Sequence, residues 1–455
     1  MGFSSGHRGF FKFENITTEL KPEINIFEAV DETLHYLDGM GSNNHSYSLK
    51  QLKKEKLVTV TGNDSFISAQ YINPSDKSYF IFEGKNEGKG DLALVLKING
   101  KEICKTKIEM TLRGIEKYYQ KWTLSATDDD IVQMPSSYEP NGDLEYKPKT
   151  DDYVIYVHGW RMLPGEKKRW AETMFKRLWW QGYRGYFSYL DWPTLWVNSD
   201  YVSLLSNPEN FDRSEYRAYQ TGKYLAGILS DLKNSPHGGK VRILAHSMGN
   251  TVAGEAIRQL PDDGGYLLTY IATQPAVSAH AYDNTLPNDA PFLFNGINYG
   301  PDTPEVLENY FVNNRWKMFP GGMFRYFNIK DPALKGWEKN NFLKPDNNYH
   351  YIGNEISYTP APAGTDRFFK DIGNGEKDLT FNIELERYEI LSRCVESRSK
   401  TLGSVSGHVS GFYDTDLNDK FEFGSKDYDH SRQFMSNIIR EWPYWNLFMI
   451  NCMLK

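Results

Sequence analysis

The chain has 455 residues, of which 40% are hydrophobic and 24% are charged, and its formal net charge is −7. This length is sufficient for two or three domains, and no apolar run approaches the roughly 18 residues that span a membrane. An acidic chain without long lysine or arginine runs lacks the basic surface that nucleic-acid binding requires. We therefore expect no transmembrane segment and no nucleic-acid partner.

The cysteines and the first residues give little information about the compartment. Cys104, Cys394 and Cys452 are too few and too scattered for a disulfide framework or a zinc cluster. The start of the chain, MGFSSGHRGFF, lacks the apolar segment of a signal peptide, and Gly6 stands where a myristoylation signal has serine or threonine. The sequence predicts no cofactor, and the chain could be one part of a longer exported protein.

The first part of the chain alternates short strand-like runs. Residues 57–112 contain LVTV, FISAQYI, YFIFEG, DLALVLKI and KEICKTKIEMTL, and Asn99-Gly100 joins the last two. An Asn-Gly pair between such runs is a strong hairpin signal, because both residues tolerate the positive φ of a type I′ turn. We therefore predict a small β-rich module over residues 1–125, with its binding partner left open.

Residues 126–150 are rich in Asp, Pro, Ser and Gly, a composition typical of a linker. Beyond the linker, strand-like runs alternate with helical patterns, which is the rhythm of a parallel sheet. The runs are YVIYV (153–157), GYFSYLDW (185–192), KVRILA (240–245), YLLTYIA (266–272) and MFRYFNI (323–329). The sequence thus predicts a second domain of the α/β class over residues 151–455.

The stretch KVRILAHSMGNTVAGEAIRQLP, residues 240–261, places Ser247 between an apolar strand-like run and a helix. Ala245 and Gly249 stand two residues before and after it, where a sharp turn leaves little room for side chains. In such an elbow the serine oxygen is exposed above the sheet, and the N–H of Met248 points toward a developing oxyanion. The same pattern also fits a plain turn in which Ser247 caps the helix.

The first strand of the second domain ends in YVIYVHGWR, with His158 and Gly159 at the turn. Glycine allows a close approach of the main chain. The backbone N–H of Trp160 can therefore face Ser247 as a second oxyanion donor. A plain glycine turn between a strand and a helix is the alternative.

Four motifs together resemble the α/β-hydrolase superfamily. They are HGW after the first strand, LDWPT (190–194), the helix SEYRAYQTGKYLAGIL (214–229) and LAHSMGN (244–250). The chain is most similar to lipase-like members with an AHSMG elbow and to a bacterial group with AHSMGN, over roughly residues 150–450. The resemblance implies a mostly parallel central sheet with helices on both faces, the chain order Ser, acid, His, and ester hydrolysis.

The acid is expected after a late strand. Asp331 follows MFRYFNI, at the carboxyl end of a strand, where open α/β sheets place their ligands. Asp283, after YLLTYIA, is the second candidate. Asp331 could also merely begin a turn with Pro332.

The base is expected near the C-terminus, where the superfamily carries it. The histidines that follow the elbow are His280, His350, His408 and His430. We select His430, because it lies in a polar loop directly before an amphipathic helix. His408, in a Gly/Ser-rich loop, is the alternative, and His350 lies between two tyrosines. His246, next to the serine, is expected to pack or to position.

These residues predict a serine hydrolase that cleaves a small-molecule or lipid ester. His430, oriented by Asp331, removes the proton of Ser247, which attacks the carbonyl while the Met248 and Trp160 amides hold the oxyanion. Amide or thioester hydrolysis by the same groups is an alternative. A further alternative is a non-catalytic binding or assembly module on a hydrolase scaffold.

Two segments suggest additional features. Residues 285–322 mix aromatic residues with Gly and Pro, which is typical of a lid over an apolar pocket, and an excursion packed on the sheet edge fits equally. DTDLND (414–419) spaces oxygen ligands as a calcium loop does, but Asp419 occupies the position of the required glycine. We therefore predict no metal site.

Overall fold

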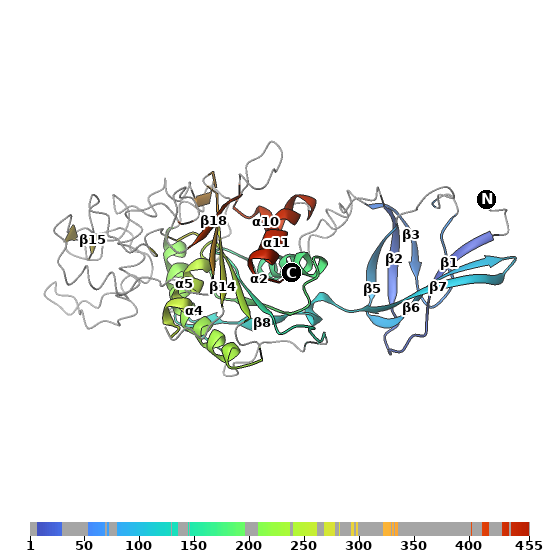
Figure 1. The fold of residues 1–455 in the computed structure, drawn as a ribbon, viewed down its shortest axis with the longest axis horizontal. Helices are drawn as coiled ribbons and strands as arrows, with labels where there is room; N and C mark the ends of the chain where they lie inside the picture. The colour runs from blue at the N-terminus through green and yellow to red at the C-terminus, as the bar shows by residue number, and fades with distance from the viewer. Residues whose placement is uncertain are drawn as a thin grey trace. The chain divides into compact units, whose positions relative to one another are not determined.

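Figure 1 shows the chain as a computed structural model. The structure describes residues 7–29, 53–68, 71, 80–128, 130–134, 144, 146–195, 208–236, 240–261, 268–277, 282, 293–294, 297–298, 322–328, 330–331, 333–334, 402, 412–417, 430–435 and 438–454. Two compact units result. Unit 1 comprises Met1–Tyr118, Asp143–Tyr146 and Met435–Glu441, and unit 2 comprises Tyr119–Gly142, Lys147–Phe434 and Trp442–Lys455. Within the described ranges, no helix is long and apolar enough to cross a membrane.

Unit 1 contains two antiparallel sheets, with the strand orders β4-β1-β6-β7 and β3-β2-β5. The strands are β1 (His7–Glu14), β2 (Glu23–Ala29), β3 (Lys53–Val60), β4 (Ser65–Phe66), β5 (Phe80–Asn86), β6 (Gly88–Ile98) and β7 (Lys101–Leu112), followed by the short helix η3 (Ile115–Lys117). Asn99 and Gly100 join β6 to β7 with φ values of 50° and 80°, both positive as a type I′ turn requires. The N-terminal β-rich region is thus confirmed.

Unit 2 is built on a seven-stranded sheet with the order β18-β17-β14-β13-β11-β12-β8, in which every neighbouring pair is parallel. The strands are β8 (Gln120–Thr123), β11 (Tyr153–Val157), β12 (Tyr186–Asp191), β13 (Val241–His246), β14 (Thr269–Thr273), β17 (Met323–Phe327) and β18 (Tyr413–Asp416). Every residue of β11, β13 and β14 is buried, which explains why these strands read as continuous apolar runs.

Helices cover both faces of this sheet (Figure 1). One face carries α4 (Pro208–Lys233) and α5 (Gly249–Gln259), and the other carries α2 (Pro164–Trp180), α10 (Arg432–Met435) and α11 (Ile438–Asn451). Two short pairs, β9 (Ser125–Ala126) with β10 (Val132–Gln133) and β15 (Leu293–Phe294) with β16 (Ile297–Asn298), lie outside the main sheet. The predicted parallel central sheet with helices on both faces is therefore confirmed.

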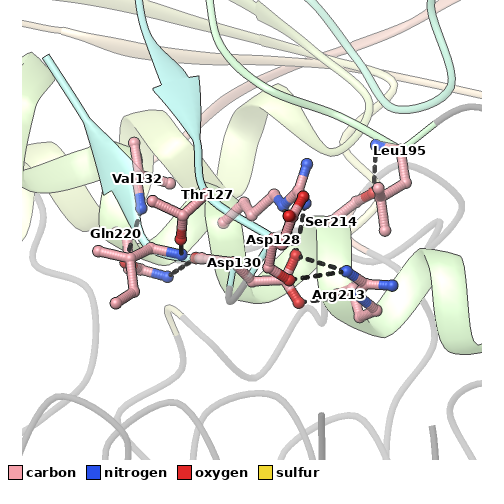
Figure 2. A network of polar contacts seen from close by, with 10 residues as sticks. Thr127, Asp128, Asp130, Val132, Leu195, Arg213, Ser214 and Gln220 are labelled. Carbon is pink, nitrogen blue, oxygen red and sulfur yellow. Dashed lines mark hydrogen bonds and ion pairs between the residues drawn. The ribbon is translucent and has the colours of Figure 1, made fainter. Parts of the chain in front are cut away.

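The segment that follows Tyr119 is fastened to unit 2 by a polar network (Figure 2). The carboxylate of Asp130 accepts hydrogen bonds from Arg213 Nε at 2.7 Å and from Arg217 Nε at 2.8 Å, both on α4. Gln220, also on α4, donates to the Asp130 carbonyl and accepts from the Val132 amide. The first strand of the parallel sheet along the chain is β8, which pairs with β12. It lies inside residues 1–125, the range that the sequence groups with the N-terminal module.

Several predicted features lie outside the described residues. They are Asp283, His280, His350, His408 and the greater part of the segment 285–322. The lid and the alternative acid and bases therefore stay predictions.

Candidate active site

Ser247 occupies a sharp turn between β13 and α5. Its φ is 54°, a left-handed conformation that is strained for a non-glycine residue and persists only where the surroundings enforce it. The Ser247 amide donates to the carbonyl of Thr273, and the Ser247 carbonyl accepts from Asn250 Nδ2 at 2.8 Å and from the Ala276 amide. Backbone contacts on both sides therefore hold the elbow in this conformation.

The interpretation of Ser247 as a simple helix cap is wrong. The N-cap residue of α5 is Met248, in αR conformation and without a side-chain cap hydrogen bond. A capping serine would have an extended backbone and would bond an amide of the first turn. The elbow interpretation fits the backbone instead.

The turn after β11 lies directly against the elbow. A Cβ atom added to Gly159 would lie 2.9 Å from Ser247 Cβ, and one added to Gly249 would lie 2.5 Å from the His158 carbonyl oxygen. Ala245, the other small residue of the motif, is fully buried in β13. Because only hydrogen atoms fit at the two glycines, His158-Gly159 and the elbow can be in contact.

His158 fixes the direction of the next peptide group. Its ring is fully buried, and Nδ1 lies 2.7 Å from the carbonyl oxygen of Gly159, so Nδ1 must carry the hydrogen. Burial lowers the pKa of His158 to about 3, which keeps the ring neutral. The C=O and N–H of a trans peptide point in opposite directions. The bond to Gly159 therefore directs the Trp160 N–H away from the His158 ring.

The LDWPT motif packs against the turn after β11 through Trp192. Trp192 is fully buried, stacks on the His158 ring at 5.3 Å and donates its Nε1–H to the His158 carbonyl at 2.8 Å. Lys167, near the start of α2, donates to the Trp192 carbonyl at 2.7 Å and to Asp191 Oδ1 at 2.9 Å. The motif therefore connects β12 and α2 to the peptide that follows β11.

Asp331 and His430 form a hydrogen-bonded pair. Nδ1 of His430 lies 2.8 Å from Oδ2 of Asp331, and Asp331 is fully buried. The same carboxylate accepts from Gln274 Nε2 at 2.9 Å and from the amides of Ala333 and Leu334. Since Nδ1–H of His430 is used for Asp331, Nε2 is the nitrogen that can accept a proton.

The pair lies beside the elbow. Nε2 of His246, the residue before Ser247, is 2.7 Å from the carbonyl oxygen of His430, and the two imidazole rings are 4.8 Å apart. The His430 side chain keeps 20% of its surface exposed. The structure thus brings together Asp331, His430 and the elbow, which lie far apart in the sequence.

The two expected oxyanion donors lie on the two segments that meet here. Met248 directly follows Ser247 and precedes α5, and the first amides of a helix have no partner within it. Trp160 directly follows Gly159, which contacts Ser247.

Sequence reasoning missed two residues that support the site. Gln274, directly after β14, has a φ of 42° and bonds the Asp331 carboxylate. Asn250 donates to the Ser247 carbonyl and accepts from the Tyr270 hydroxyl at 2.7 Å. The only sequence signal for either is a polar side chain at the carboxyl end of an apolar strand or in the first turn of the following helix.

The first acidic residue of the candidate calcium loop, Asp414, forms an ion pair with an arginine. Both carboxylate oxygens of Asp414 bind Arg325, at 2.7 and 2.8 Å, and Arg325 is fully buried. Among the described residues there is no group of three or more His, Cys, Asp or Glu side chains that could hold a metal ion.

Part of unit 2 matches a known protein family, which agrees with this architecture. Residues 147–277 match a family described as "Alpha/beta hydrolase of unknown function (DUF900)". The comparison with curated proteins gives no match. Among solved structures, the chain is similar to an acylaminoacyl peptidase from Pyrococcus horikoshii, with 11% sequence identity and a TM-score of 0.27. That alignment covers 80% of this chain and 47% of the peptidase, so the chain spans about half of that protein.

Proposed function

We propose that this member of the α/β-hydrolase superfamily is a serine hydrolase that cleaves carboxylic esters through Ser247, His430 and Asp331. The observation that carries this proposal is the Asp331–His430 hydrogen bond beside the strained elbow. A serine nucleophile needs a base to take its proton and a carboxylate to orient that base. The elbow, the base and the carboxylate supply these three parts.

In the proposed reaction, Nε2 of His430 takes the hydroxyl proton of Ser247 while the serine oxygen attacks the ester carbonyl carbon. The buried Asp331 carboxylate stabilises the imidazolium that results. His430 then gives the proton to the departing alcohol, and an acyl-serine ester is left. Water, deprotonated by His430, attacks this ester and releases the carboxylic acid and the free serine.

The amides of Met248 and Trp160 are proposed to hold the negative charge on the carbonyl oxygen in both steps. Two features support this role. The His158–Gly159 hydrogen bond fixes the peptide that bears the Trp160 N–H, and Trp192 holds the turn by stacking on the His158 ring and by donating to the His158 carbonyl. A fixed donor is what makes an oxyanion site effective, since no reorganisation is needed during the reaction.

The substrate is proposed to be a small-molecule or lipid ester. Amide and thioester bonds would be cleaved by the same groups, so the leaving group has to be determined by assay. A series of p-nitrophenyl esters of increasing acyl length would identify the preferred chain.

The test of the nucleophile is fluorophosphonate labelling followed by intact mass. We expect one adduct on the wild type and none on Ser247→Ala. Ser230→Ala is the matched control, because Ser230 lies on α4 and its hydroxyl donates to the Ala226 carbonyl of the same helix. His430→Gln should be labelled far more slowly than the wild type. A folded wild type that is neither labelled nor active on any ester would refute the proposal and favour a binding module on a hydrolase scaffold.

A further inference from the structure

Strand β13 carries the elbow and also contacts the segment that carries the base. Val241, Ile243 and Ala245 belong to the apolar core cluster that includes residues of α4 and α5. Successive side chains of a strand point to opposite faces. Arg242 and His246 therefore lie on the other face, toward the C-terminal segment 430–452.

Both side chains bind backbone carbonyls of that segment. Nε of Arg242 donates to the carbonyl of Cys452 at 2.8 Å, just after the end of α11. A cation at this place offsets the helix dipole and satisfies a terminal carbonyl. Nε2 of His246 contacts the carbonyl of His430 at 2.7 Å, just before α10. One strand therefore holds both ends of the base-bearing segment.

The contact defines the protonation state of His246. A carbonyl oxygen can only accept, so Nε2 of His246 must carry the hydrogen. Burial holds the pKa of His246 well below its usual value, so the ring is neutral with Nδ1 unprotonated. A neutral ring also places no positive charge beside the His430 imidazole, 4.8 Å away.

The ring of His246 has little freedom to turn. Trp170 of α2 and Phe434 of α10 contact it edge-on at 5.5 and 5.3 Å, and these two rings stack on each other at 4.8 Å. A Cβ atom on Gly159 would lie 3.1 Å from its Nδ1, so the turn after β11 closes the remaining side. The Nε2–H group of His246 is therefore held pointing in one direction.

We propose that His246 is a positioning residue that fixes the base His430 relative to the nucleophile by hydrogen bonding to its backbone carbonyl. Asp331 holds the same residue at its ring, so His430 is fixed at both ends. The strand that leads into the Ser247 turn thus sets the place of the base as well. This inference rests on the proposed roles of Ser247 and His430.

The test compares two replacements of His246. His246→Phe keeps a ring of similar size and removes the donor, and His246→Gln keeps an N–H donor at similar reach. Since a displacement of about 1 Å can cost about 10²-fold in rate, we expect kcat of the Phe variant to fall about 10- to 100-fold with KM little changed. The Gln variant should recover a large part of this loss. Trp170→Phe is the control for packing, because it alters the aromatic contact and leaves the donor in place.

A second readout does not depend on activity. Histidine ¹⁵N NMR of the full chain should show His246 as the neutral Nε2–H tautomer throughout the range of about pH 5 to about pH 8 in which an ordinary histidine titrates. The low-field proton between His430 and Asp331 should be sharp in the wild type and broadened in His246→Phe.

Two results would overturn the inference: an unchanged kcat in the Phe variant, or equal losses in the Phe and Gln variants, which would indicate packing alone. If the wild type proves inactive, the proposed function fails. The tautomer and the low-field proton would then still decide whether His246 holds His430.

Discussion

Gly249→Ala is expected to destabilise unit 2 and to slow the reaction of Ser247. The added Cβ would lie 2.5 Å from the His158 carbonyl oxygen and 2.6 Å from that of Val157, whereas ordinary contact begins at 3.4 Å. Both oxygens belong to the main chain at the end of a fully buried strand, so neither can rotate away. The elbow or the end of β11 has to move by about 0.9 Å to relieve the clash.

The size of the effect follows from two opposing terms. Inserting a methyl group into a closely packed site costs typically about 1–3 kcal/mol, and two backbone contacts this short favour the upper end. Alanine in place of glycine gains up to about 1 kcal/mol in a helix interior, and less at the first position of α5. The free energy of unfolding should therefore fall by about 2 kcal/mol. A shift of nearly 1 Å at Ser247 should lower the labelling rate about 10²-fold.

The sequence offers a selective assay. All eleven tryptophans belong to segments of unit 2, so urea unfolding followed by tryptophan fluorescence reports that unit alone. Gly159→Ala is a graded comparison, because its Cβ would meet Ser247 Cβ at 2.9 Å rather than main chain at 2.5 Å. Its loss of stability should be smaller. Gly84→Ala, in β5 of unit 1 with open space around it, controls for the residue change itself. A Gly249→Ala protein with the wild-type unfolding midpoint and labelling rate would refute the reasoning.

Three further outcomes are expected. Asp331→Asn should lower kcat about 10⁴-fold with the fold retained. The reason is that the amide group places a hydrogen-bond donor among the donors that surround this carboxylate, including Nδ1–H of His430. A loss of kcat below tenfold, with native circular dichroism, would contradict the role of Asp331 as the acid. Gln274→Leu removes a hydrogen bond to the same carboxylate and should lower kcat about 10- to 100-fold, measured by steady-state hydrolysis, and a change in KM alone would argue against it. The pKa of His158 is lowered to about 3 and that of His246 is also lowered, so the unfolded chain binds more protons below its ordinary histidine pKa of 6.5. The contribution of these two histidines to the stability of unit 2 should therefore be fully present above that pH and be lost as the pH falls below it, and equal urea midpoints at about pH 7.5 and about pH 5 would exclude this.

The fold could be predicted because its signals are local. Parallel strands buried on both faces read as apolar runs, and five of the seven strands of the sheet were expected from such runs. The exception at the N-terminal end is β8, whose sequence QKWT alternates like the antiparallel strands before it. Its membership of the parallel sheet depends on pairing with β12, which lies far along the chain.

The residues of the candidate site likewise differ in whether a local sequence signal predicts them. The elbow and the turn at His158 and Gly159 are short motifs and could be predicted from spacing. Asp331 was expected from its place after a strand and His430 from the chain order of the superfamily, and the structure brings the two together. Gln274 could not be predicted to bind Asp331, because that contact joins residues 57 positions apart through the packing of neighbouring strands.

The backbone of Ser247 argues for a function on grounds independent of any motif. A left-handed conformation at a non-glycine residue costs of order 1–3 kcal/mol and persists only where other contacts offset it. Here the amide of Ser247 and its carbonyl are both bonded, the carbonyl three times over, by Asn250 in main chain and side chain and by Ala276. A simple strand-to-helix connection does not require such strain, since an extended N-cap residue would join β13 to α5 without it. The strained turn places Ser247 directly after His246, whose Nε2 is hydrogen-bonded to the backbone carbonyl of His430. The strain is therefore best explained by the position that it gives to the Ser247 side chain.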